Sequence, residues 1–347
     1  MSKVGFRWGR PKAWAVPKAQ GLKGPYEKNE ALARLSPMGR VDGAAGPESL
    51  AVASDGTLYS GYDDGRIVQF TREGRQIREL TRTGGRPLGL RFHPNGDLLV
   101  CDAERGLLRV NPMGDITVLA TEAEGIPFGL ADDLDVDQEG RCVYFSDATS
   151  CWSLADNQLD LIEHGGHGRL LCHDLITGST RVLMRDLQFA NGVTLGPDDA
   201  CVLVVETGMY RVHRFWLKGD RAGQHEVWLD DLPGFPDNVR FNGRDRFWVA
   251  IPAPRNRLLD LLAPFPALRF CVIQLARWLP TPVAHAAIAL AFDLDGKLVA
   301  NLQSHRPGGF HFITQVLETD QWLYCSSLHA KTFAGMPWPA SSTQPAR

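Results

Sequence analysis

The residues best suited to chemistry in this chain are oxygen-bearing side chains at the starts of four strand-like segments. They are Glu48, Asp132, Asn191 and Asp237, and Asn238 directly follows the last of them. Carboxylate and amide oxygens without His or Cys favour Ca²⁺, in preference to Mg²⁺ or Mn²⁺, and argue against Zn²⁺. Without a cation, carboxylates that converge would raise one another's pKa. We therefore predict a calcium site formed by these five residues.

The four segments share one register, which indicates that their first polar residues occupy equivalent places. Counting from Glu48, Asp132 and Asn191, apolar residues come at the second and fourth positions, and a turn begins at the seventh. Such alternation, ended by a turn, is typical of a strand that leads into an antiparallel partner. Asp237 keeps the start of the pattern, although its turn comes early. The alternative for each residue is a local hydrogen bond at a strand end.

Repeated strand pairs at this spacing, about 40 to 60 residues, are typical of a β-propeller with one four-stranded blade per repeat. Six blades fit the chain, with starts near Glu48, Leu88, Asp132, Asn191, Asp237 and Thr314. We assign a further match at Ile288 to the outer strands of blade five, because too little sequence follows it for another blade. The prediction is an all-β fold, a single six-bladed β-propeller over residues 29–340. The alternative is an open or sandwich-like all-β protein with chance periodicity.

Composition limits the functions open to the chain. The 347 residues carry 37 basic and 40 acidic side chains, a net charge of -3, so we expect no nucleic-acid binding, which normally needs a basic face. The seven cysteines show neither a disulfide framework nor a CxxC metal motif. No signal peptide or membrane span is visible, and we expect a cytoplasmic protein.

Two segments depart from the β pattern. Residues 1–28 form a basic, aromatic arm that either wraps its own domain or contacts an anionic membrane as a peripheral protein. Residues 256–282, within or after blade five, have the apolar spacing of two short amphipathic helices separated by a bend that contains proline. This helical insertion is a lid, a docking surface for a membrane or partner, or a structural plug between blades.

The chain resembles the strictosidine synthase-like branch of six-bladed propellers, within the wider group of senescence marker protein 30, gluconolactonases, paraoxonases and diisopropylfluorophosphatase. The resemblance covers about residues 24–336. It rests on Gly46-Pro47-Glu48-Ser49, Arg86-Pro87-Leu88-Gly89, Val143-Tyr144-Phe145-Ser146-Asp147, Phe189-Ala190-Asn191-Gly192-Val193, Val205-Glu206-Thr207 and Leu232-Pro233-Gly234-Phe235-Pro236-Asp237-Asn238. It implies a central Ca²⁺ held by Glu48, Asn191 and Asp237.

Departures from the relatives limit which reaction the resemblance implies. Asp132 stands where the metal-dependent relatives usually have Asn, and Leu88 replaces the paraoxonases' catalytic His. Where the strictosidine synthases carry a catalytic Glu, residues 312–316 contain no acid, and the nearby Glu318 lies deeper in the strand. We therefore expect a calcium-dependent hydrolase for lactones or esters of hydrophobic small molecules. The resemblance to lactonases and phosphotriesterases places Asp237 at the metal as the group that attacks or activates water. The alternatives are a non-catalytic propeller that binds a partner or membrane, or a strictosidine synthase-like condensing enzyme.

Overall fold

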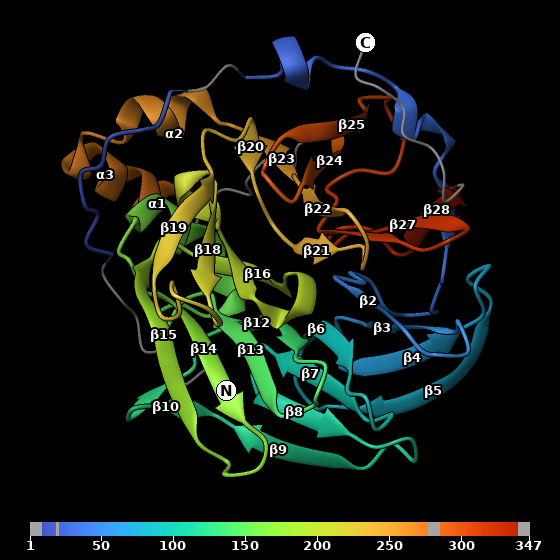
Figure 1. Cartoon of the computed structure of the whole chain (residues 1–347). Coiled ribbons are helices and arrows are strands. Elements are labelled where there is room, and N and C mark those ends of the chain that lie inside the picture. Colours follow the sequence, from blue (N-terminus) through green and yellow to red (C-terminus); the bar gives the residue numbers. More distant parts are fainter. Residues whose placement is uncertain (1–8, 19–20, 277–284, 339–347) are drawn as a thin grey trace.

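The computed structural model describes residues 9–18, 21–276 and 285–338 and shows a six-bladed β-propeller. Figure 1 shows the six four-stranded antiparallel sheets arranged around a common centre. Blade one comprises β2 (Leu50–Val52), β3 (Leu58–Gly61), β4 (Arg66–Phe70) and β5 (Gln76–Arg82). Blade two comprises β6 (Pro87–Phe92), β7 (Leu98–Asp102), β8 (Gly106–Val110) and β9 (Ile116–Ala120). Blade three comprises β12 (Ala131–Val136), β13 (Cys142–Asp147), β14 (Gly168–Asp174) and β15 (Thr180–Leu187).

The other three blades complete the ring. Blade four comprises β16 (Ala190–Leu195), β17 (Cys201–Glu206), β18 (Arg211–Trp216) and β19 (His225–Leu229). Blade five comprises β21 (Val239–Phe241), β22 (Arg246–Ala250), β24 (Ala287–Asp293) and β25 (Leu298–Ser304). Blade six comprises β26 (Gln315–Glu318), β27 (Trp322–Ser326), β28 (Phe333–Pro337) and β1 (Ser36–Met38). The predicted fold and all six blade starts are confirmed. The strand that contains Ile288 is β24, which pairs with β22 in blade five as expected.

Blade six takes its outermost strand from near the beginning of the chain. β1 pairs with β28, so residues from the two ends of the propeller sequence share one sheet. Pro37 lies within β1, and proline, which lacks an amide hydrogen, is tolerated in such an edge strand. This pairing closes the ring of blades.

The core lies between neighbouring blades. Because the inner strands are covered on both faces, strands such as β7, β16 and β17 are buried along their whole length. Blades two and three, for example, share a cluster that includes Leu99, Cys101, Leu134 and Phe145. Further apolar clusters join other neighbouring blades, so the packing holds the inner strands at fixed positions around the axis.

The innermost strands β2, β6, β12, β16, β21 and β26 all start at one end of the propeller, which we call the head end. Strands β13 and β22 end there, and each is followed by an insertion. The insertion after β13 contains η3 (Leu154–Asp156) and α1 (Asn157–Glu163), and the one after β22 contains α2 (Arg257–Leu262) and α3 (Pro266–Ala276). The two predicted helices are thus present, and residues 277–282 of the predicted insertion lie outside the described residues. In Figure 1 the three α-helices gather on one side of the ring.

Short elements complete the connections between blades. They are η1 (Gly24–Tyr26), η2 (Ala31–Arg34), η4 (Pro197–Asp199) and η5 (Thr207–Met209), and the two-stranded ribbons formed by β10 (Glu122–Ala123) with β11 (Ile126–Pro127) and by β20 (Gly234–Phe235) with β23 (Ala253–Pro254). No helix in the described part of the chain has the length and apolar character needed to cross a bilayer.

Candidate metal centre at the propeller axis

The head-end residues meet through two amide-carboxylate pairs. Asn238 Nδ2 donates a hydrogen bond of 2.6 Å to Glu48 Oε1, and Asn191 bonds the side chain of Asp237. All four side chains are at least nine-tenths buried, as is Asp132. The structure therefore brings blades one, four and five together at this point, from positions up to 190 residues apart in the sequence.

The backbone brings these blade starts into close contact. The amide of Gly192 donates to the Asp237 carbonyl at 3.2 Å, and a Cβ on Gly192 would lie 2.5 Å from the Asn238 Cα. Only glycine permits that approach. The Thr314 hydroxyl donates to the Glu48 carbonyl at 2.6 Å, which joins blade six to blade one. Thr314 thus has a structural role here.

Three buried oxygens of this cluster lack a hydrogen-bond partner: Glu48 Oε2, Asn191 Oδ1 and Asn238 Oδ1. An unpartnered buried acceptor is costly, typically about 1 to 3 kcal/mol. A cation bound beside these oxygens would give them a partner, and carboxylate and amide oxygens are the ligands that Ca²⁺ prefers. The residues present therefore fit a divalent cation.

The electrostatics of the cluster agree with this fit. Burial, then the nearby Asp133, raises the pKa of Glu48 to about 7. Burial and the Glu48 charge also raise the pKa values of Asp132 and Asp237 well above their usual range, and Asp132 is raised further by Asp237. Asp132 therefore interacts electrostatically with Glu48 and Asp237. Bringing these groups together in ionised form requires positive charge.

Two buried arginines supply part of that charge, and neither was among the predicted site residues. Arg240 Nη2 donates to Asp133 Oδ1 at 2.5 Å, and its Nη1 bonds the carbonyls of Leu134 and Val193. Arg86 Nη2 donates to the Gly46 carbonyl at 2.5 Å, and its charge lowers the pKa of Glu48.

With Asp133 included, four buried carboxylates interact with one another near the axis, and the two arginines lower the pKa of Glu48 among them. The group of four is Glu48, Asp132, Asp133 and Asp237.

A second, more compact cluster lies in the α1 insertion. Asp160, Glu163 and His167 form the one group among the described residues in which three or more such side chains have ligand atoms all within 4.8 Å of one another. Asp160 Oδ1 already accepts hydrogen bonds from Thr149 and Tyr210. Both Glu163 oxygens also accept, so this cluster is accounted for as a polar network that holds α1.

The axial carboxylates are more widely spaced than this cluster. Oxygen ligands on opposite sides of one Ca²⁺ lie up to about 5 Å apart, so a calcium site does not require all its ligand atoms to lie within the 4.8 Å that the Asp160 cluster satisfies.

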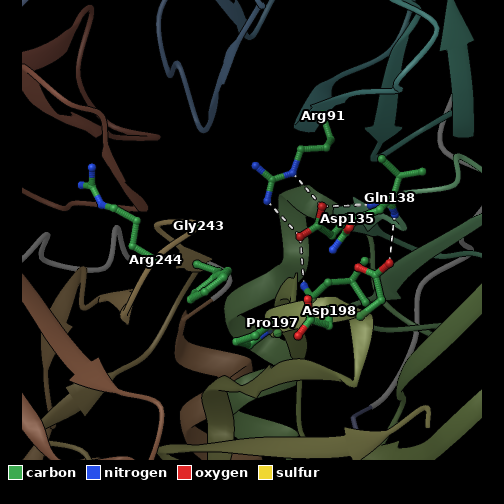
Figure 2. A pocket seen from close by; sticks show the side chains of 12 residues that line it. Arg91, Asp135, Gln138, Pro197, Asp198, Gly243 and Arg244 are labelled. Atoms are coloured by element: carbon green, nitrogen blue, oxygen red, sulfur yellow. Dashed lines mark hydrogen bonds and ion pairs between the residues drawn. The ribbon is translucent and has the colours of Figure 1, made fainter.

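A cavity of about 360 Å³ lies at the opposite end of the axis, where the inner strands end. Figure 2 shows Arg91 and Asp135 joined across its wall, with Arg244 on the other side. Arg91 donates two hydrogen bonds to Asp135, and Arg244 is paired with Glu318 and Asp320. The charges of Arg91, Asp135 and Arg244 are therefore already paired within the protein.

Comparison with known proteins shows the family to which the chain belongs. Residues 132–220 match the sequence model described as Strictosidine synthase, and residues 24–70 match Strictosidine synthase-like, N-terminal. The adipocyte plasma membrane-associated protein of Salmo salar is 34% identical over 333 residues, which cover 89% of this chain and 79% of that protein. The strictosidine synthase-like protein 6 of Arabidopsis thaliana is 36% identical, over 81% of this chain and 76% of that protein. The chain belongs to the strictosidine synthase-like family.

Solved structures extend the likeness of this strictosidine synthase-like chain to other propellers. A gluconolactonase of Xanthomonas campestris superposes with a TM-score of 0.60 at 17% identity, covering 90% of this chain and 94% of that one. A calcium-binding regucalcin of Agrobacterium tumefaciens superposes with a TM-score of 0.58 at 15% identity, covering 87% and 90%. At these identities the comparison shows a shared fold, the β-propeller.

Proposed function

We propose that this protein is a calcium-dependent hydrolase that opens lactones or cleaves esters of hydrophobic small molecules. The observation that carries the proposal is the set of three buried oxygens at the axis that lack a hydrogen-bond partner, one of them a carboxylate oxygen and two of them amide oxygens. The likeness to gluconolactonase and regucalcin propellers supports the reaction class. Glu48, Asp132, Asn191, Asp237 and Asn238 would hold the ion. When bound, Ca²⁺ would polarise the substrate carbonyl.

Asp237 is the reacting carboxylate in this proposal. Its hydrogen bond from Asn191 orients the carboxyl group, and burial keeps bulk water from weakening its interactions. As an ionised group it would attack the carbonyl or take a proton from water. Asn191 and the Gly192 contact then act as the supports that hold this side chain in place.

Apolar residues at the starts of the inner strands support a hydrophobic substrate. Leu88, Leu130 and Phe189 come directly before or at the starts of their inner strands, and they form one buried cluster with Ala103 and Ala148. Leu154 and Leu161 of the α1 insertion pack against it. Because these residues neighbour the axial residues at the starts of the inner strands, we expect them to favour a hydrophobic substrate.

A condensing activity of the strictosidine synthase kind would need an acid near Thr314, and residues 312–316 contain none. Glu318, the acid nearest Thr314 in the sequence, accepts hydrogen bonds from Trp248 at 2.6 Å and Arg244 at 2.7 Å. It lies at the other end of β26 from the head-end carboxylates, because β26 runs from Gln315 to Glu318. We therefore expect no condensation of an amine with an aldehyde.

The decisive variant is Asp237→Asn. An amide oxygen can still bind Ca²⁺, but it is neither a base nor an effective nucleophile. We expect hydrolysis of a panel of lactones and aryl esters to fall by about 10²-fold or more, with Ca²⁺ binding retained in calorimetry. Asp198→Asn, at an exposed position lining the opposite cavity, is the matched control and should keep full activity.

Two results would contradict the proposal. Full turnover by Asp237→Asn would remove Asp237 as the reacting group. Absence of turnover by the native protein across the whole panel would favour the second candidate, a binding propeller, which the exposed apolar helices α2 and α3 support.

A further inference from the structure

The helix pair α2–α3 carries apolar residues on its outside as well as on its inside. Its inner side buries Ala263 and Ile273, the latter in a cluster with Trp152, Leu159 and Ile162. Its exposed positions over residues 257–275 are Arg257, Leu258, Leu261, Pro264, Phe265, Ala267, Leu268, Cys271 and Leu275. A surface helix normally carries polar residues on its outer face, and a helix that is apolar all round is normally covered.

This apolar face is a concentrated feature of the described surface. Of the twelve large apolar side chains that are exposed, five lie within residues 258–275, at exposed fractions of 51% to 69%. They are Leu258, Leu261, Phe265, Leu268 and Leu275. The other seven are spread over the blades, where single apolar residues are ordinary. A gathered patch of this kind marks a surface that contacts something.

The polar residues of the helix pair are directed inward. Asp260 accepts a hydrogen bond of 2.8 Å from the Tyr210 hydroxyl. Arg269 is buried and donates to the carbonyls of Lys12 and Ile162. After Arg257, therefore, none of the exposed positions up to 275 carries a charge, an amide or a hydroxyl.

That lack of polar groups favours lipid over protein as the occupant. Interfaces between proteins form roughly one hydrogen bond per 100 to 200 Å² and carry polar rims. A bilayer interior offers no hydrogen-bond partner, so a side that after Arg257 presents aliphatic and aromatic groups and one thiol, that of Cys271, suits it.

The charges around the patch suit an anionic lipid surface. The arm runs beside α2, since the Trp14 amide donates to the Ala263 carbonyl at 3.3 Å. Residues 9–18 and 255–275 together contain six basic residues and one acidic residue. Arg10, Lys18 and Arg257 are exposed. Basic residues near an apolar face attract a protein to anionic headgroups.

We propose that the outer face of α2–α3, with its basic border, docks on an anionic lipid bilayer. Because α2 and α3 follow β22 at the head end, docking would turn the end that holds the axial carboxylates toward the membrane. The inference does not rest on the proposed hydrolase activity, since the surface exists whether or not the axial site turns over substrate.

The test measures co-sedimentation of the full chain with phosphatidylcholine vesicles, with and without phosphatidylserine. We expect binding to the anionic vesicles, and a drop on the order of 100-fold in partitioning for the double variant Leu261→Ser/Leu268→Ser, since each leucine contributes roughly tenfold. Both positions are more than half exposed, so the double variant should fold, which its thermal melt will verify. The matched control Met113→Ser/Ile176→Ser changes two residues that are 82% and 75% exposed elsewhere and should bind normally.

Three outcomes would overturn the inference. The native chain could fail to bind vesicles of either composition, or the Leu261→Ser/Leu268→Ser variant could bind as tightly as the native chain. In the third outcome, gel filtration would show a native dimer that this variant converts to a monomer without any vesicle binding, and a second copy would then be the occupant.

Discussion

At the scale of single residues, the axis is organised by charge. Arg240 is 2% exposed, and its guanidinium reaches Asp133 and two carbonyls from blades three and four. A buried ion pair adds little stability compared with an apolar replacement of the whole pair. Removing one partner alone is costly, because it leaves a buried charge.

Replacing Arg240 with methionine should therefore destabilise the fold strongly. We expect a loss of about 3 to 5 kcal/mol in the free energy of unfolding, measured by urea denaturation without added metal. Arg244→Met is the control, since Arg244 forms ion pairs with its side chain 39% exposed, and it should cost about 1 kcal/mol or less. Equal losses in both variants would show that Asp133 is not held ionised by Arg240.

Calcium should stabilise the protein through the axial oxygens. A cation that binds only the folded state raises the free energy of unfolding, by about 2.7 kcal/mol at a concentration 100 times its Kd. We expect added Ca²⁺ to raise the melting temperature of the native chain, and Glu48→Gln to weaken Ca²⁺ affinity in calorimetry. An unchanged affinity in both Glu48→Gln and Asn191→Ala would disprove a shared site.

The sequence revealed the polar blade starts but not Asp133. Period-two alternation puts Asp133 on the opposite face from Asp132, so the pattern does not predict that Asp133 belongs to the site. In the structure, the pairing of β12 with β13 shifts register between Ala131 and Leu134. Such a bulge changes where side chains point, and it cannot be read from alternation alone. The equivalent shifts in blades two and four enclose Gly89 and Gly192, which add no side chain there.

At the scale of elements, the arm, α1 and α3 form one joint at the head end. The Lys12 amide donates to the Glu163 carbonyl at 3.0 Å. Trp14 stacks on His164 with ring centroids 4.0 Å apart. Arg269 of α3 donates to carbonyls of both other parts. The arm therefore fastens the two insertions to each other.

This joint should depend on pH through His167 and Glu163, whose side chains lie 3.3 Å apart. Hydrogen bonds with Cys151 and then Glu163 raise the pKa of His167 to about 9. The contribution of the charged His167 to the stability of the fold is therefore full below about pH 6.5 and disappears as pH rises through 9. Although burial opposes it, the bonds from His167, the Arg10 amide and Trp152 lower the pKa of Glu163 to about 2. The contribution of the ionised Glu163 to the stability of the fold is full above about pH 4.5 and disappears as pH falls toward 2.

The measurement compares thermal unfolding of His167→Gln and the native chain. We expect a loss on the order of 1 kcal/mol at pH 6 and a much smaller one at pH 10. The exposed His225→Gln serves as the control and should show no such difference. A His167→Gln loss that stays constant across this range would mean that the imidazole is not charged in the fold.

The two insertions differed in how well their sequences predicted them. The α2–α3 segment contains enough regularly spaced leucines to indicate helices. The α1 helix has only seven residues and is followed by His164 in the left-handed conformation, so its apolar pattern is too short to recognise. Its partners, Trp14 and Ile273, come from segments more than 100 residues away, and local sequence carries no sign of them.

At the scale of the whole molecule, stability depends on how the ring closes. β1 of blade six leads directly to Gly39, whose amide and carbonyl bond Gly74 and Tyr62 of blade one at 3.0 and 2.5 Å. The blade starts were predicted from internal repetition, but this strand exchange was not, because a three-residue strand has no periodicity. Its position is set by its partner β28 and by the requirement that the last blade have a fourth strand.

Gly39 is the point at which closure is most easily disturbed. Its φ is +66°, and a Cβ added there would overlap the ring of Phe333, which packs in the core that blades one and six share. Gly43 has a similar φ of +76° but no atom within 4 Å of an added Cβ. Alanine at either position carries backbone strain of about 1 to 2 kcal/mol, but at Gly39 it must also displace a buried aromatic ring.

We therefore expect Gly43→Ala to cost about 1 to 2 kcal/mol and Gly39→Ala about 3 kcal/mol or more, measured as free energies of unfolding in urea. Hydrogen exchange should locate the excess, with amides of β28 and β1 losing protection in Gly39→Ala before those of blades two to four. Equal costs at the two glycines would show that Phe333 moves aside freely and that the junction between blades six and one is not a tightly packed closure.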